Sequence, residues 1–515
     1  MTELPKGWAP ARLSDICDIN PRVDKSAIDH TQLVSFVPMP AVEAENGRID
    51  VSVTRPFGEV KQGYTPFQTG DVLFAKITPC MENGKMAIVP KMPSEYGFGS
   101  TEFHVLRALC GVEPRFIYHI VSNQGFRYYA EHHMTGAVGQ KRVPASLLAD
   151  HPVAVPPLNE QRRIVQKIEA VFEQIDKGVE SLRVAKTTLG LYRQSLLKSA
   201  FEGRLTAAWR AQNPDKLETP KALLARIQKE RETRYKSALD DWQTALSEWR
   251  AGGEVGRKPG KPSRPEAQSE IPLSELELLS DLPKEWMFTK LANLGDLGRG
   301  KSKHRPRNDK RLFDGRYPFI QTGEVKAANR FVREFTATYS DFGLEQSKLW
   351  PAGTLCITIA ANIAQTAFLT FEACFPDSIV GFTAFSGGVS PEYVESFIAS
   401  ARMNIEAYAP ATAQKNINLN TLETLNIPIC SPAEQAEITR ILDARLTAAD
   451  AMEAEINAAL LRAEALRQSI LKQAFSGTLV PQDPTDEPAP TLLARIKAER
   501  AKAGKTKPRK TAHAG

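Results

Sequence analysis

The chain repeats itself, and the two copies stay in step through one long segment. From Gln140 onward, about sixty residues match a second copy that begins 274 residues later, without a gap. The run RQSLLKSAFEGRL from Arg193 corresponds to RQSILKQAFSGTL from Arg467. A repeat of roughly 270 residues is too long for a solenoid unit. The duplication therefore predicts two globular modules, each followed by a helix of fixed length.

Both copies carry an apolar heptad pattern over the matching segment. Apolar residues recur at alternating steps of four and three, which is typical of coiled-coil packing. The segments begin at PLNEQ or SPAEQ and end at a glycine suited to a left-handed C-cap, Gly203 or Gly477. The second begins with Ser431-Pro432-Ala433-Glu434, which predicts a capping box with Pro at the first helical position. We predict two helices, residues 158–203 and 431–477, that pack against each other. The expected packing residues are Ile164, Ile168, Ile175, Leu182, Leu189 and Leu196, together with Ile438, Leu442, Met452, Ile456, Leu466 and Ile470.

A simpler alternative is that each helix packs only on its own module. About 40 residues at 1.5 Å each give roughly 60 Å, which is longer than a domain of this size. The length therefore favours a helix pair.

The modules themselves have the pattern of α+β domains. Short apolar runs broken by Gly and Pro, such as DVLFAKI from Asp71, alternate with helical stretches such as PRFIYHIVSN from Pro114. We predict recognition modules over residues 1–157 and 282–430. The remaining segments are a charged helix with a flexible linker, 204–281, and a basic C-terminal tail, 478–515, that we expect to be disordered.

Composition excludes several classes of protein. The six cysteines are scattered without a CxxC pair, which indicates neither a disulfide framework nor a zinc site. The start of the chain lacks a signal-peptide pattern, and the most apolar stretch is too short and polar to span a membrane, so a cytoplasmic location is expected. The net charge of +6 resides mainly in the last 21 residues, so overall basicity is weak support for nucleic-acid binding.

One segment fits the GxxxxGK[ST] phosphate-loop pattern, Gly295 to Ser302. That motif needs a buried strand before it and a helix after it, whose N-terminus meets the phosphate. The following KHRPRNDKR is a poor helix start. An ATP-using enzyme therefore stays as an alternative, and a basic DNA-contacting loop is the preferred interpretation of the segment.

The candidate DNA-binding residues are positively charged or polar side chains on turns and loops. Adjacent His132 and His133 point apart on any regular element, so we expect no metal site. Gln140-Lys141 and Gln414-Lys415 stand at matching positions before the last strand of each module, which suits either phosphate positioning or a structural hydrogen bond. The candidates are Lys76, Thr78, Lys85, Arg127, Lys141 and Arg142 in the first module and Arg299, Lys301, Lys303, Arg305, Arg307, Lys415 and Asn416 in the second.

The repeated motifs together resemble a known family. LPKGW at Leu4 returns as LPKEW at Leu282, and PLNEQ and RQSLLKSAFEGRLT mark the helix entrance and exit. This combination resembles the specificity subunit of type I restriction-modification systems, over nearly the whole chain except the linker and the tail. The resemblance implies two target-recognition domains, antiparallel helices that place them in inverted orientation, and binding of double-stranded DNA.

The resemblance also implies what other subunits do. Two modification subunits would methylate adenine, and restriction subunits would translocate and cut DNA. S-adenosylmethionine, ATP and magnesium would bind those partners, leaving this chain without cofactor or catalytic residues. A second alternative is a solitary DNA-binding scaffold that binds no methyltransferase.

Overall fold

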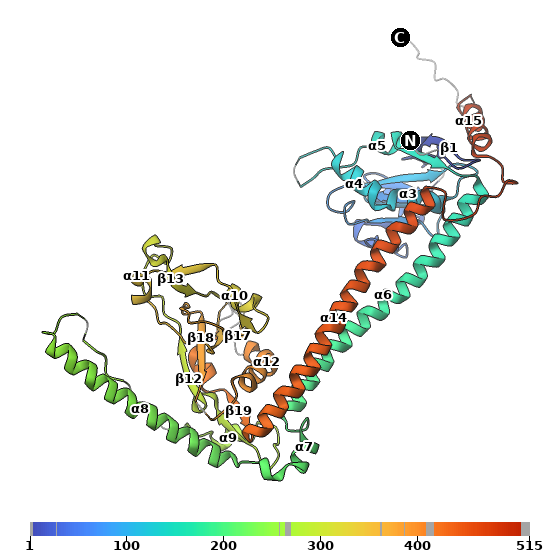
Figure 1. Ribbon diagram of the computed structural model, residues 1–515. Helices are drawn as coiled ribbons and strands as arrows, with labels where there is room; N and C mark the ends of the chain where they lie inside the picture. Colours follow the sequence, from blue (N-terminus) through green and yellow to red (C-terminus); the bar gives the residue numbers. More distant parts are fainter. Residues whose placement is uncertain are drawn as a thin grey trace. The chain divides into compact units, whose positions relative to one another are not determined.

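The structure is a computed structural model in which two compact units are distinguished. The first unit comprises residues Met1–Val184 and Ile456–Gly515, and the second comprises residues Ala185–Glu455. Each unit contains one module and parts of both long helices (Figure 1). The described residues are 4–26, 28–137, 139–256, 258–262, 269–360, 363–385, 387–407 and 417–505, with side chains left aside at 403–407 and 503–505.

The first module is built on two four-stranded sheets. One is antiparallel with the strand order β2-β9-β6-β7, and the other has the order β4-β3-β8-β5 with β3 and β8 parallel. Strand β6 is buried along its length, as its continuous apolar run predicted, and α3 packs on the first sheet. The bounds are β1 Ala9–Arg12, α1 Leu13–Ile16, β2 Cys17–Ile19, β3 Leu33–Val37, η1 Met39–Ala41, β4 Thr54–Pro56, α2 Phe57–Val60, β5 Thr65–Gln68, β6 Val72–Ala75, β7 Met86–Ile88, β8 Tyr96–Gly99, β9 Phe103–Ala108, α3 Pro114–Ser122, α4 Gln124–His132, α5 Ala145–Asp150 and β10 Pro152–Val155.

The second module has one five-stranded sheet and a small outer pair of strands. The sheet order is β12-β18-β16-β17-β14, and β13 pairs with β15 outside it. The bounds are β11 Met287–Lys290, η3 Leu291–Asn293, β12 Gly295–Arg299, η4 Lys310–Leu312, β13 Phe313–Phe319, α10 Thr322–Ala327, β14 Phe331–Val332, β15 Ala337–Tyr339, α11 Asp341–Glu345, β16 Leu355–Thr358, β17 Thr366–Leu369, β18 Ile379–Ala384, α12 Pro391–Ala407, α13 Leu419–Glu423 and β19 Asn426–Ile429.

The two modules share a scaffold and differ at its periphery. Strands β2-β9-β6-β7 of the first correspond in order to β12-β18-β16-β17 of the second. Each module also pairs its first strand with its last, β1 with β10 and β11 with β19, both antiparallel. Beside this scaffold, the first module has the sheet β4-β3-β8-β5, whereas the second has the β13-β15 pair and adds β14 to the main sheet. One fold thus carries two different surfaces.

The long helices form an antiparallel pair within the second unit. Arg193 of α6 bonds Asp450 of α14 at 2.7 Å, while Lys186, earlier on α6, lies 3.9 Å from Glu453, later on α14. Within the first unit, Asp176 of α6 pairs with Arg467 of α14. The fold class predicted from the sequence, two α+β modules with two long antiparallel helices, is confirmed. The helices outside the modules are α6 Leu158–Phe201, α7 Ala207–Gln212, α8 Pro220–Ala251, α9 Leu273–Leu276, α14 Pro432–Phe475 and α15 Ala489–Lys505, and η2 spans Pro214–Lys216.

The predicted apolar seam is continuous only near the modules. Met452 and Leu466 are 59% and 49% exposed, so their assignment to the seam is wrong. A heptad pattern drifts by about 20° per heptad against a straight helix, which carries distant positions off the contact line. Among the other predicted positions, the buried ones are Ile164, Ile168, Leu196, Ile438, Leu442 and Ile470, and the half-buried ones are Ile175, Leu182, Leu189 and Ile456.

In the first unit, the repeated motifs meet at one junction. Trp8 of LPKGW donates its indole N–H to the carboxylate of Glu160 at 3.0 Å. Gly477 ends α14 with a φ of +73°, and Pro5 lies where a side chain on that glycine would be. Gln161 accepts from the backbone N–H of Glu113 at 3.0 Å. The motifs that carry the family resemblance therefore join helix ends to the module.

The second unit repeats this junction with its own motifs. Trp286 donates to Glu434 at 3.0 Å, and Gly203, with a φ of +72°, ends α6 against Pro283. Ser431 caps α14 by accepting the Glu434 backbone N–H at 3.3 Å. The predicted capping box is only half formed, because the Glu434 carboxylate turns to Trp286 and to the segment after α6 instead of back to Ser431.

Two repeated LLARI sequences complete the two cores. Leu492 and Ile496 of α15 are buried in the core of the first unit, and Leu223 and Ile227 of α8 are buried in that of the second. The expectation of a disordered tail over residues 478–515 is therefore wrong for the part that forms α15. Arg495, Lys497, Arg500 and Lys502 of α15 are exposed, while Leu492 and Ile496 contribute to the core. Among the described residues, no helix has both the length and the apolar character needed to cross a membrane.

Candidate nucleic-acid interface

The phosphate-loop motif does not form a phosphate loop. Its first five residues are strand β12, which pairs along its length with β18, and residues 300–309 are irregular. A Cβ at Gly300 would collide with the carbonyl oxygens of Phe375 and Pro376, so acceptors crowd the place where phosphate needs donors. The ATP-site alternative is wrong at this segment.

The segment instead forms a basic loop, residues 299–311, with Arg299 and Arg307 tied at one side. Arg299 donates its Nε–H to the backbone carbonyl of Asp377 at 2.9 Å. Arg307 reaches both carboxylate oxygens of Asp377 at 3.0 Å. Asp377 precedes β18, so this pairing fastens the basic loop to the central sheet.

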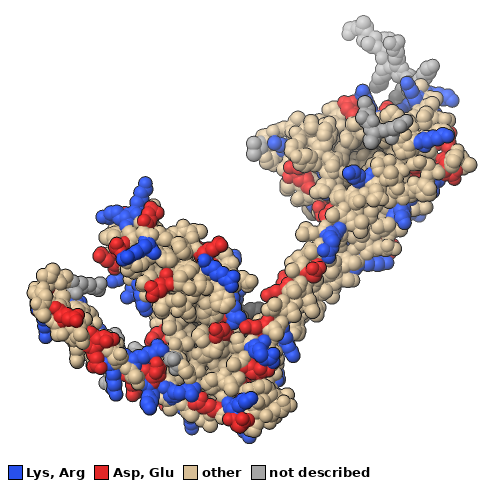
Figure 2. All heavy atoms as spheres, in the orientation of Figure 1, with Lys and Arg blue, Asp and Glu red and all other residues tan. Residues whose placement is uncertain are grey.

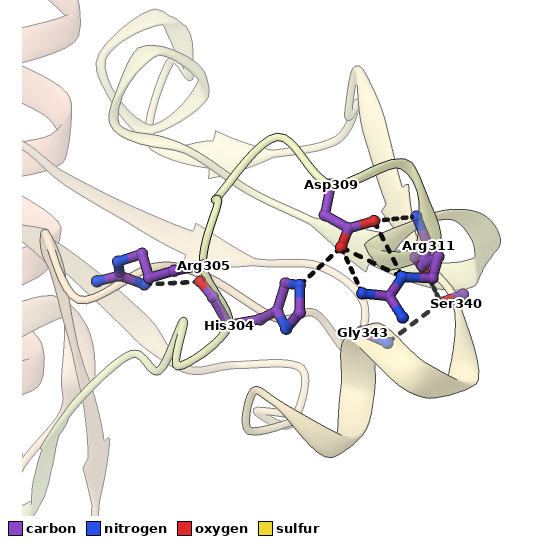
Figure 3. Close-up of polar contacts among 6 residues, drawn as sticks. All are labelled: His304, Arg305, Asp309, Arg311, Ser340 and Gly343. Carbon is purple, nitrogen blue, oxygen red and sulfur yellow. Dashed lines mark hydrogen bonds and ion pairs between the residues drawn. The ribbon is translucent and has the colours of Figure 1, made fainter.

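Asp309 organises the other side of the basic loop (Figure 3). Its carboxylate accepts from His304 Nε2 at 2.7 Å and from Arg311 Nη2 at 2.8 Å, and the Arg311 backbone N–H donates to it at 3.0 Å. These bonds hold the pKa of Asp309 well below its usual range, with the Arg311 side chain the largest cause. The carboxylate therefore stays charged and acts as an internal anchor.

The lysines of the basic loop remain exposed. Arg305 donates to the carbonyls of Ser302 and His304 at 2.6 and 2.8 Å, so it closes the loop on itself. In the described part of the chain, the side chains of Lys301 and Lys303 make no hydrogen bond or ion pair, and both are exposed. They are the cations best placed to meet a phosphate backbone.

One lysine beside the basic loop was missed by sequence reasoning. Lys348 lies with its Nζ 3.6 Å from the centre of the Trp350 ring. Burial is the main cause that lowers its pKa, and the nearby charge of Lys301 lowers it further. Figure 2 shows several positive side chains, with negative ones among them, at the end of the module that carries β13 and α11, and charges of both signs along α8.

In the first module, four predicted residues come together. The backbone N–H of Thr78 donates to the carbonyl of Lys141 at 3.1 Å, and Ile77 forms a β-bridge with Arg142. Lys76 lies one residue further back, where its carbonyl accepts from Val143 at 2.8 Å. The loop after β6 and the segment before α5 thus form one surface, although they are about sixty residues apart in sequence.

Arg142 within this cluster is held by an acid. Its guanidinium forms a bidentate pair with Glu102, at 2.9 and 2.8 Å, and the pKa of Glu102 is lowered mainly by this bond. Lys141 and Thr78 border a hollow of about 400 Å³. The residues that line it are Thr78, Glu82, Glu131, His132, Met134, Gly139 and Lys141.

Lys85 and Arg127 lie elsewhere and are engaged with the backbone. Lys85 donates to the carbonyls of Met39 and Val42, at 3.3 and 2.9 Å. The Arg127 side chain is 15% exposed and donates to the carbonyl of Glu82 at 3.0 Å. These contacts stabilise the turn after β6 and leave little of either side chain for DNA.

The two adjacent histidines lie at the C-terminal end of α4. His132 and His133 each bond a backbone carbonyl one helical turn back, at 2.8 Å. Lys415 and Asn416 lie outside the described residues. The acids Asp309, Asp377 and Glu102 were not among the candidates. A lone aspartate in a basic run could have drawn attention to Asp309, but no local pattern links Arg307 to Asp377.

Comparison with known proteins supports the resemblance. The family described as type I restriction modification DNA specificity domain matches residues 5–181 and 283–462. The EcoEI specificity subunit of Escherichia coli is 39% identical over 180 residues, 34% of this chain and 30% of that protein. The EcoKI specificity subunit of Escherichia coli K12 is 24% identical over 534 residues, 98% of this chain and 97% of that protein.

Solved structures show the same fold. The HsdS subunit from Thermoanaerobacter tengcongensis aligns with a TM-score of 0.54 and 18% identity, over 93% of this chain and 98% of that one. A chain from a structural study of the assembly and conformational transition of the type I R-M system aligns with a TM-score of 0.64 and 19% identity, over 93% and 100%. With both halves matched by the family, the chain belongs to the type I restriction-modification DNA specificity family.

Proposed function

We propose that this chain is the DNA specificity subunit of a type I restriction-modification complex. Each module reads one half of a bipartite target on double-stranded DNA. The chain catalyses no reaction and binds no cofactor. Two modification subunits methylate adenine with S-adenosylmethionine, and restriction subunits use ATP and magnesium to translocate and cut.

The observation that carries this proposal is a shared scaffold with basic residues in different places. In the first module, Lys76 and Thr78 follow β6, which is the second strand of the shared sheet in sequence order. In the second, Lys301 and Lys303 follow β12, the strand equivalent to β2. Two unlike half-sites require two different surfaces on one scaffold. Contacts to base edges determine which sequence is read, whereas contacts to phosphates position the protein on the duplex.

Methylome sequencing tests the proposal directly. Strains with and without this gene should differ by one bipartite methylated motif. Replacing residues 1–157 with the first module of another family member should change one half of that motif and leave the other half intact. A hybrid that folds but alters both halves contradicts the modular assignment.

A solitary DNA-binding scaffold remains the second candidate. It predicts that the full chain purifies without a methyltransferase when the neighbouring genes are co-expressed. It also predicts an unchanged methylome after deletion. Copurification of a modification subunit at a fixed ratio excludes this candidate.

A further inference from the structure

We propose that Asp309 is a positioning residue for the second half-site. It folds the basic loop so that Lys301 and Lys303 are presented to DNA, and it makes no DNA contact itself. The inference rests on the proposed function and assigns a role within the same surface.

The contacts of Asp309 tie the basic loop together across several residues. The carboxylate joins His304 to Arg311, and its side chain is 16% exposed. It also caps the short turn Lys310–Leu312 by accepting the Arg311 backbone N–H. His304 and Arg305 directly follow Lys303, so this anchor limits where the two lysines can point.

The anchor continues into the neighbouring helix. The hydroxyl of Ser340 donates to the carbonyl of Arg311 at 2.6 Å and accepts the backbone N–H of Gly343 at 3.1 Å (Figure 3). Because Gly343 belongs to α11, the chain of bonds runs from the basic loop to a regular element. The backbone of both lysines is also bonded. The Lys301 carbonyl accepts from Ser347 Oγ at 2.9 Å, and the Lys303 N–H donates to the Gln346 carbonyl at 3.2 Å.

Electrostatics alone makes the opposite prediction for Asp309. A negative charge in a DNA-contacting loop repels phosphates, so removing it should tighten binding and steepen the salt dependence. Removing an acid that organises the loop should instead weaken binding, because the loop must then become ordered as it binds DNA. The sign of the effect separates the two roles.

The test compares Asp309→Asn with Asp314→Asn in the full chain assembled with its modification subunits. Both changes remove one negative charge. Asp314 is exposed on β13 and, among the described residues, its side chain has no hydrogen bond or ion pair. Asparagine tolerates its φ of +63°. Affinity is measured by fluorescence titration across a salt series, on duplexes carrying the motif found by methylome sequencing.

We expect Asp309→Asn to weaken binding by roughly tenfold, the order expected when one or two residues must be ordered on binding. The slope of log affinity against log salt should stay unchanged, since the same lysines meet phosphates. Lys301→Ala should lower that slope by about 0.9. Asp314→Asn should leave affinity equal or slightly higher. Base-pair changes in the first half of the DNA motif should lower the affinity by the same factor in all protein variants.

A second variant protects the test against misfolding. His304→Ala removes one donor to Asp309 without changing either lysine, and it should weaken binding in the same direction. Hydrogen exchange of β12 and β18 checks that the sheet is intact. Asp309→Asn binding as tightly as Asp314→Asn, or tighter, overturns the inference. Failure of the wild-type complex to prefer its motif would instead overturn the proposed function.

Discussion

Glu160 and Glu434 occupy the same repeat position, and both are buried, at 1% and 0% exposure. Glu434 accepts from Thr206 at 2.7 Å and from Arg210 at 2.9 and 2.8 Å, besides its tryptophan. Glu160 has its tryptophan and the side chain of Gln482, while the nearby Arg163 is bonded to Asp486 instead. The second junction therefore neutralises its buried acid, and the first does not.

The difference appears in the electrostatics of Glu160. Burial raises the pKa of Glu160, opposed in part by the hydrogen bond from Trp8 and the charge of Arg163. The two junctions differ because the segments that follow the long helices α6 and α14 differ. Val480 stands where the first copy has Thr206, and the following segment is five residues shorter, which removes the counterpart of Arg210. A repeated motif can thus be preserved while its charge balance changes.

The largest expected effect comes from Glu434→Gln. Arg210, whose side chain is 11% exposed, would then be left without its counter-charge. Breaking a buried ion pair costs about 3–5 kcal/mol. Native-state hydrogen exchange of β11 and β19 in the full chain should report a loss of this order. Peptides from β1 and β10 serve as the internal control, and a loss smaller than 1 kcal/mol would break the comparison.

The next effect tests the two core-completing helices as a matched pair. Leu492 and Leu223 are both fully buried, in the first and second unit respectively. Leu492→Ala and Leu223→Ala should each cost about 2–4 kcal/mol, because the cavity left behind adds to the lost transfer energy. Hydrogen exchange should show each loss only in its own unit. A loss shared equally by both units would contradict the assignment of α15 to the first core.

The sequence predicted the elements that depend on local pattern. Heptad spacing located α6 and α14, and the left-handed glycines ended both helices, since these signals need no distant partner. Continuous apolar runs located the central strands. The place of α15 was missed because its basic composition masked an apolar stripe, although the LLARI repeat was already visible.

The candidate site was predictable only in outline. Charge density located the basic loop, but it could not separate Lys301, which is exposed, from Arg307, which is paired. Asp377 lies 70 positions from Arg307, and Glu102 lies 40 positions from Arg142. Such pairs depend on tertiary packing, which one sequence does not reveal.

A smaller effect should follow from converting the first junction toward the second. Val480→Thr would place a hydroxyl at the position equivalent to Thr206, where it could donate to Glu160. A hydrogen bond to a charged acceptor contributes roughly 1.5–3 kcal/mol. The first unit should gain up to that amount at neutral pH, measured by hydrogen exchange of β1 and β10. Val480→Ala is the control, and a gain seen there as well would assign the effect to packing.

The smallest effect at neutral pH is expected for Glu160→Gln, which should leave the first unit equally stable or up to about 1 kcal/mol more stable. The amide oxygen still accepts the Trp8 N–H, and the cost of burying a charge disappears.

The sign of the pH dependence of this effect follows from the raised pKa of Glu160. Between its unfolded value near 4.5 and the higher folded value, the folded chain holds a proton that the unfolded chain has released. Wild-type stability therefore falls as pH rises through that window, and the penalty is complete above the folded pKa. The advantage of Glu160→Gln should shrink as pH is lowered toward 4.5, in unfolding measurements on both proteins. A loss at pH 7 comparable to that of Glu434→Gln would show that the two junctions are electrostatically alike.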